Sequence, residues 1–223
     1  MTREGYLIET QEKLFPATLM PDRDWWQTLW PDPGATVLAL GIGAGMTAVD
    51  LCCGDGYFTA AIARQIGAGR VVGFDLDPDM LEQAKAACGQ AVNCTWIAGD
   101  ARNLSRLIGE RVDYVLIANT FHGVPDQIGL AREVAAILKP GGRFAIVNWH
   151  PLPREQTTVL GQPRGPRTEM RMSPEAVQAA VQPAGFTLKS VVELPPYHYG
   201  AVFVVGAKTS SSAVGAIFNA RKP

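Results

Sequence analysis

The stretch Val49–Phe58, with the sequence VDLCCGDGYF, constrains the fold of this chain more than any other. Its apolar first residues predict a buried β-strand, Gly54 and Gly56 predict a tight turn, and a helical pattern continues to Ile66. A strand, a glycine turn and a helix N-terminus place backbone N–H groups and the positive end of a helix toward a ligand. Asp50, at the end of the strand, can face a cationic group on that ligand. We therefore expect a binding loop here, for something other than a bare phosphate.

The glycine spacing does not fit the dinucleotide-binding fingerprint. That motif has a third glycine three residues after the second, which lets helix and strand pack closely. Thr59 stands at that place in this chain. The glycine-rich run 41–45 precedes the strand rather than following it, and Met46 occupies the place of its last glycine. We interpret that run as a turn into the strand, so an NAD(P)-dependent oxidoreductase is the less favoured function.

Asp-x-x-x-Gly-x-Gly after a strand, with Asp75 ending the next strand, resembles the class I S-adenosylmethionine-dependent methyltransferases. The run Leu-Lys-Pro-Gly-Gly-Arg at 138–143 carries the same resemblance, which covers about 46–206. Asn-Thr-Phe-His at 119–122 is similar to small-molecule methyltransferases of the ubiquinone/menaquinone type, also called type 11. One departure is Cys52, which stands where the family usually has glycine.

The resemblance implies an α/β, Rossmann-like fold with helices on both faces of a mostly parallel seven-stranded sheet whose last strand is antiparallel. It implies S-adenosylmethionine as cofactor and S-adenosylhomocysteine as product. Asp75 would hold the ribose hydroxyls, and Asp100 would accept from the adenine amino group. The implied cofactor-binding residues are Asp50, Cys52, Gly54, Gly56, Tyr57, Asp75, Leu76, Asp100, Ala101 and Asn119.

Candidate catalytic residues come from the three histidines of the chain. His122 and His150 each follow a predicted strand, on the edge where ligands bind in open parallel sheets. Either is a candidate general base for a phenol or alcohol acceptor, or else a packed wall of the site, while a thiolate acceptor needs no base. His198 lies between two tyrosines and is expected to be a sheet residue.

The four cysteines show neither zinc-site spacing nor a disulfide pattern, so we expect reduced thiols and no bound metal. Cys52 and Cys53 are expected to act as small apolar residues. A metalloid methyltransferase would require cysteines that reach the acceptor pocket.

The remaining chain suggests a covered site. We expect an N-terminal helical cap at 1–34, the methyltransferase domain at 35–207 and a flexible tail at 208–223. Trp25, Trp26, Leu29 and Trp30 share one helical face and predict either packing on the core or a lid over an apolar or aromatic substrate. Residues 151–172 are predicted to be a substrate-lid loop whose arginines (154, 164, 167 and 171) meet an anionic acceptor or form a solvated surface.

Composition and charge limit the kinds of binding partner that we expect for this chain. The net charge of −1 and the pI near 6.3 give no reason to expect nucleic acid. Neither a signal peptide nor a membrane-length apolar run is evident, so we expect a cytoplasmic protein, with its oligomeric state open. The predicted function is methyl transfer from S-adenosylmethionine to an O, S or C atom of a small molecule. The alternative is a non-catalytic S-adenosylmethionine-binding protein or subunit.

Overall fold

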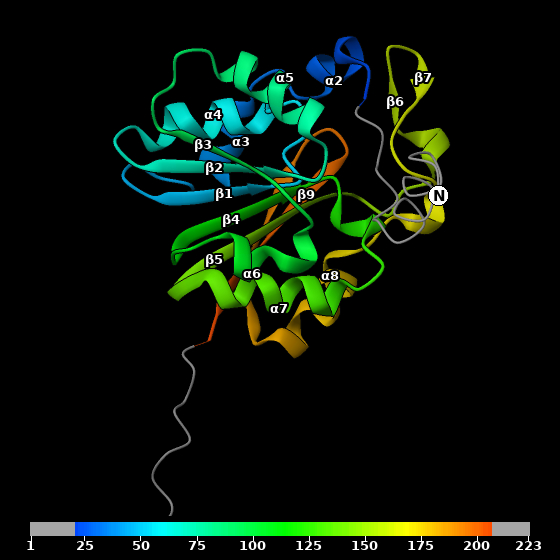
Figure 1. Cartoon of the computed structure of the whole chain (residues 1–223). Helices are drawn as coiled ribbons and strands as arrows, with labels where there is room; N and C mark the ends of the chain where they lie inside the picture. Colours follow the sequence, from blue (N-terminus) through cyan, green and yellow to red (C-terminus); the bar gives the residue numbers. More distant parts are fainter. Residues whose placement is uncertain (1–20, 207–223) are drawn as a thin grey trace, which may run out of the picture.

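A computed structural model describes residues 21–206 of the chain (Figure 1). The first twenty residues of the expected N-terminal cap and the expected tail, 208–223, lie outside the described residues. One seven-stranded sheet forms the centre, with the strand order β3-β2-β1-β4-β5-β9-β8. Its strands are β1 Thr47–Leu51, β2 Arg70–Asp75, β3 Cys94–Ala98, β4 Val112–Ala118, β5 Leu138–Trp149, β8 Phe186–Leu194 and β9 His198–Val205.

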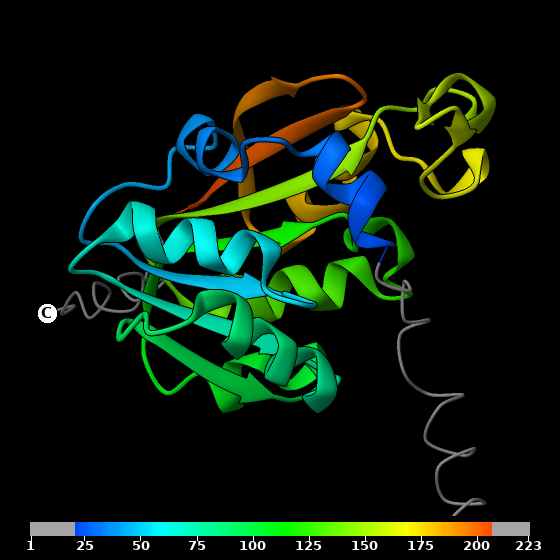
Figure 2. The same ribbon diagram turned by 90° about the horizontal axis from the view of Figure 1, so that it is seen from above.

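The pairing confirms the predicted fold class. Strands β1 to β5 pair in parallel, and β9 is antiparallel to both β5 and β8. Helices cover both faces of the sheet, as seen from the side in Figure 1 and from above in Figure 2. On one side lie α2 Arg23–Leu29, α3 Pro33–Ala39, α4 Tyr57–Ile66 and α5 Pro78–Cys88. On the other side lie α6 Leu104–Leu107, α7 Gln127–Ile137 and α8 Pro174–Val181.

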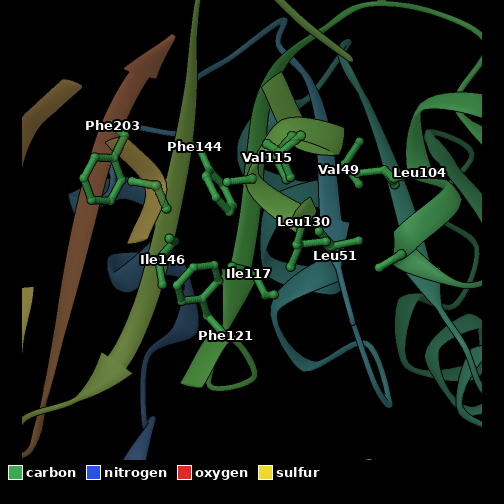
Figure 3. Packing of buried hydrophobic residues seen from close by; sticks show 14 of the residues in the cluster. Val49, Leu51, Leu104, Val115, Ile117, Phe121, Leu130, Phe144, Ile146 and Phe203 are labelled. Carbon is green, nitrogen blue, oxygen red and sulfur yellow. The ribbon is translucent and has the colours of Figure 1, made fainter. Parts of the chain in front are cut away.

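The central strands are buried on both faces because helices pack on each side, which explains their nearly continuous apolar sequences. Successive side chains of a strand point to opposite faces. In β1, Ala48 therefore packs with α3 and α4, whereas Val49 and Leu51 pack with residues of α6 and α7. Figure 3 shows the second of these two clusters, where Leu104 and Leu130 lie near the apolar side chains of β1, β4 and β5.

Residues 151–172, predicted to be a loop without regular structure, contain short elements. These are the 3-10 helices Arg154–Gln156 and Thr168–Met170 and a small hairpin of β6 Thr158–Val159 and β7 Gln162–Pro163. Figure 1 shows this hairpin beside α2. Arg164, which directly follows the hairpin, contacts Trp25 of α2 although the two residues are far apart in sequence. Further 3-10 turns occupy Ala101–Asn103, Phe121–Gly123 and Gln182–Ala184.

Strand β5 begins earlier than the sequence predicts. We expect a turn at 139–144 and a strand from Ala145, but Leu138 already pairs with Val112. The register then breaks and resumes at Tyr114 with Arg143, so the intervening Pro-Gly-Gly run forms an irregularity inside the strand. Apolar runs in the sequence predict strands at 70–75, 94–98 and 112–118, and β2, β3 and β4 have these bounds. Within residues 21–206, no helix is both long enough and apolar enough to cross a membrane.

Gly56 controls the packing of α4 against α5. It caps α4 with φ +79° and ψ 18°, and a Cβ added there would lie 2.8 Å from both Cα and Cβ of Ala84. We predict that Gly56→Ala lowers the free energy of unfolding by about 2–5 kcal/mol, because a left-handed backbone costs about 1–2 kcal/mol and an overpacked contact about 1–3 kcal/mol.

Urea unfolding measures this effect, and Gly185→Ala is the matched control. Gly185 has φ +89° and ψ 17°, yet a Cβ there would meet no atom within 4 Å. The control variant should show the backbone cost alone, and Ala84→Gly combined with Gly56→Ala should recover part of the loss. Equal losses at Gly56 and Gly185, with no coupling to Ala84, would contradict the packing account.

Candidate active site

A cavity of about 660 Å³ opens at the edge of the sheet where the parallel strands end. Residues that follow β1, β2, β3 and β4 line it, together with Trp149 at the end of β5. The remaining wall comes from α2 and from the 151–172 segment. Open parallel sheets place their ligands beyond the carboxyl ends of the strands, so this cavity is the candidate site.

Three backbone N–H groups in the segment after β1 already donate hydrogen bonds to other groups of the protein. Gly54 N–H donates to Asp75 Oδ2 at 2.8 Å, Gly56 N–H donates to the Cys53 carbonyl at 3.0 Å, and Tyr57 N–H donates to Asp55 Oδ1 at 3.2 Å. We expected such groups to face a ligand, and for these three that expectation was wrong. Of the N–H groups in the first turn of α4, that of Tyr57 already has a carboxylate partner, Asp55, and this negative charge near the helix N-terminus disfavours an anionic ligand there.

Asp50 is an acid buried in the cavity wall. It is 2% exposed, and Thr59 Oγ1 donates a hydrogen bond to its Oδ2 at 2.5 Å. Burial, with smaller contributions from the neighbouring carboxylates Asp75 and Asp55, raises the pKa of Asp50 to about 7. Thr59, which is buried, thus stands at the position where the dinucleotide-binding fingerprint needs glycine.

Asp75 ends β2 and is oriented by two backbone donors. Its Oδ2 accepts from Gly54 N–H, and its Oδ1 accepts from Asp77 N–H at 3.0 Å. Each carboxylate oxygen can accept a second hydrogen bond, so both remain able to receive hydroxyl groups. The capping residue of α5 is Asp77, which accepts from Asp79 N–H at 2.8 Å.

Two non-glycine residues that line the cavity have left-handed backbones. Cys52, after β1, has φ +60°, and Asn119, after β4, has φ +59°. Such strain costs about 1–3 kcal/mol and gathers at functional sites. The Cys52 angle also explains why glycine suits this place in the resembling family. Among the described residues, no group hydrogen-bonds the buried side-chain amide of Asn119.

Most predicted site residues meet at the cavity: Asp50, Cys52, Gly54, Tyr57, Asp75, Leu76, Ala101, Asn119 and His122 line it. Gly56, Asp100 and His150 do not. Gly56 faces Ala84, as described above. Asp100 caps the turn at Ala101–Asn103 and pairs with Arg102, whose Nη2 lies 2.5 Å from Asp100 Oδ2.

The two candidate histidines have different surroundings. His122 lies in the cavity wall, where burial lowers its pKa and favours the neutral imidazole. His150 Nε2 lies 3.0 Å from Glu193 Oε2, outside the cavity lining. Trp149, the last residue of β5, lines the cavity, whereas His150 comes after the strand and contacts Glu193 of β8 instead. His198 lies in β9, between the rings of Trp30 and Trp149.

Aromatic side chains form another part of the cavity wall. Trp25 and Trp26 from α2 line the cavity and are also buried in the protein, so α2 both packs on the core and covers the site. Tyr57 OH donates to the Trp30 carbonyl at 2.6 Å, which ties α2 to α4. Sequence reasoning missed Trp149, although its place at a strand end is the same signal that identified His122.

Arg171 holds the 151–172 segment together. It is 8% exposed, and its Nη2 donates to Thr157 Oγ1 at 2.9 Å and to the Arg164 carbonyl at 3.1 Å. Its guanidinium also lies 5.1 Å from the Trp149 ring. We expected this arginine to meet an anionic acceptor or solvent, but it is a buried structural residue.

All four cysteines are free. Cys52 and Cys53 line the cavity, and burial raises the pKa of both thiols, which disfavours the thiolates that a metalloid site would use. Across residues 21–206, no three His, Cys, Asp or Glu side chains are grouped to hold a metal ion.

The raised pKa of Asp50 predicts a pH-dependent cost in stability. In the unfolded chain its pKa is 3.8, so between about pH 4 and 7 only the folded protein holds this proton, and stability falls as the pH rises. We expect Asp50→Asn, which removes this term, to gain stability relative to the parent protein as the pH rises from about 4 to 7, by up to about 1.4 kcal/mol per pH unit, and to gain no more above pH 7.

Urea unfolding at several pH values measures the difference, with exposed Asp79→Asn as control. The control should differ from the parent protein by a nearly constant amount. A constant difference for Asp50→Asn as well would show that Asp50 ionises normally.

Comparison with known proteins agrees with this geometry. Residues 48–142 match the family model described as "Methyltransferase domain". Demethylmenaquinone methyltransferase of Staphylococcus aureus is 36% identical over 104 residues, which are 46% of this chain and 43% of that protein. The chain thus aligns with less than half the length of the curated relatives it matches.

Solved structures extend the likeness to the whole sheet. A SAM-dependent methyltransferase from Aquifex aeolicus superimposes with a TM-score of 0.68 at 23% identity, covering 78% of this chain and 89% of that one. The DhpI–SAH complex structure gives a TM-score of 0.62 at 19% identity over 92% of this chain and 95% of that one. Residues 48–142 are thus similar to methyltransferase domains, and the chain has the fold of the class I S-adenosylmethionine-dependent methyltransferases.

Proposed function

We propose that this protein is an S-adenosylmethionine-dependent methyltransferase that transfers a methyl group to an O, S or C atom of a small molecule. The observation that carries the proposal is the concentration of carboxylates in the cavity wall after β1 and β2. Asp50, Asp55, Asp75 and Asp77 all line this part. S-adenosylmethionine carries two cationic groups, a sulfonium and an ammonium, and only one carboxylate. An acidic cavity wall therefore attracts it more than a dinucleotide, whose two phosphates are anionic.

The chain's own residues suit this cofactor in further ways. Asp75 presents two oriented carboxylate oxygens, which match the pair of ribose hydroxyls. The unpartnered amide of Asn119 gains hydrogen bonds if the cofactor's polar groups reach it. Asp50 becomes ionised when a cation binds beside it, because the cation offsets the burial that raises its pKa.

The chemistry requires positioning more than a reactive side chain. The cofactor supplies an electrophilic methyl group on sulfur, and its product is S-adenosylhomocysteine. The protein must align an acceptor lone pair and exclude water, and the tryptophan wall from α2 and β5 serves both needs. His122 is the proposed base where the acceptor is a phenol or alcohol, because its neutral imidazole faces the cavity.

The relatives support a small-molecule acceptor. The Staphylococcus aureus relative is named for demethylmenaquinone, a quinone, and the DhpI structure holds the demethylated cofactor. A cytoplasmic location is also part of the proposal and is supported by the four free thiols. A non-catalytic cofactor-binding subunit shares the same loop, so activity must be measured directly: purified protein with S-adenosylmethionine should form S-adenosylhomocysteine when an acceptor is present.

The ribose role of Asp75 gives a direct test. We predict that Asp75→Ala weakens binding of S-adenosylhomocysteine at least about tenfold, because a hydrogen bond to a charged group is worth roughly 1.5–3 kcal/mol. Calorimetric titration measures this, and Asp79→Ala on the exposed start of α5 should bind like the parent protein. Unchanged affinity in Asp75→Ala would remove this assignment, and binding of NADH in place of S-adenosylhomocysteine would overturn the proposed function.

A further inference from the structure

The cavity is divided by charge. Its acids follow β1 and β2, whereas the arginines that line it, Arg154, Arg164 and Arg167, all come from the 151–172 segment. Trp25, Trp26 and Trp149 line the same cavity. A cavity with separate acidic and basic walls favours two ligands of opposite charge, or one ligand whose ends differ.

Among the three arginines that line the cavity, Arg164 has the most hydrogen-bonding capacity left for a ligand. Its guanidinium carbon lies 5.1 Å from the centre of the Trp25 ring, which holds the planar group against α2. Its Nε is buried, and within residues 21–206 it has no hydrogen-bond acceptor. A buried donor without an acceptor is costly, so a ligand that supplies one gains affinity.

The other two arginines are partly engaged. Arg154 Nε donates to the Gly165 carbonyl at 3.0 Å, which leaves its terminal nitrogens to donate elsewhere. Arg167 is 3.3 Å from Glu169 and highly exposed, so its charge is largely balanced and screened. The positive charge that acts in the cavity therefore comes mainly from Arg154 and Arg164.

The backbone around Arg164 is held rather than free. Arg164 N–H donates to the Thr157 carbonyl at 2.9 Å, and the Arg164 carbonyl accepts from both Thr157 Oγ1 and Arg171 Nη2. A cation held this way loses little conformational freedom when it binds an anion.

We propose that the methyl acceptor is a flat, apolar molecule that carries an anionic group such as a carboxylate, received by Arg164 and Arg154. Its aromatic body lies against the tryptophan side chains, and its reacting atom faces the acidic half of the cavity. This inference rests on the proposed function and specifies its substrate class. A neutral quinone, the kind of acceptor for which the Staphylococcus aureus relative is named, would leave both arginines unpaired.

The test compares 2-naphthoate with its neutral isostere 2-naphthamide, by calorimetric titration in the presence of saturating S-adenosylhomocysteine. We expect the parent protein to prefer the carboxylate at least about tenfold, the effect of one charge-assisted hydrogen bond in a partly buried site. The Arg154→Gln/Arg164→Met double variant should lose this preference yet still bind the amide. Arg164→Lys, which keeps the charge, should retain part of it.

Arg132→Gln, on the exposed side of α7, is the charge-matched control and should behave like the parent protein. Thermal unfolding confirms that each variant is folded. Equal affinity for the two probes, binding of neither, or a preference that survives in the double variant overturns the inference. Failure of S-adenosylhomocysteine to bind would instead overturn the proposed function, so the two failures are distinguishable.

Discussion

Parallel pairing of β1 with β2 and β4 is the constraint on which the site depends. Parallel strands end at the same edge, so the segments after them must meet there although they are far apart in sequence. The hydrogen bond from Gly54 N–H to Asp75 Oδ2 then joins the ends of β1 and β2. The loop that opens α4 and the acid that ends β2 therefore form one rigid unit.

This unit places a carboxyl group in buried surroundings, which disfavour its ionised form. Asp50 is buried beside two other carboxylates, and burial raises its pKa because it disfavours the ionised carboxylate. A cationic ligand reverses this cost, because it favours the ionised carboxylate. The same negative charge disfavours diphosphates, so under the proposed function this one buried acid would contribute both to affinity and to selectivity between cofactor classes.

The other half of the cavity is built from segments outside the central sheet. α2 contributes tryptophans, and the segment after β5 contributes arginines that are held in place by buried Arg171. The two segments contact each other through Arg164 and Trp25. Under the proposed function, the strand ends would select the cofactor, and the elements that cover them would select the acceptor.

The sequence by itself determined the elements whose signals are local. Apolar runs located β2, β3 and β4, and the motif beginning at Asp50 located a loop that lines the cavity. The tertiary structure alone decided which partners the side chains have. His150 lies beside Glu193, and Arg171 is buried against Thr157 and Arg164. Side-chain direction and burial depend on neighbours that are distant in sequence, and no local pattern encodes them.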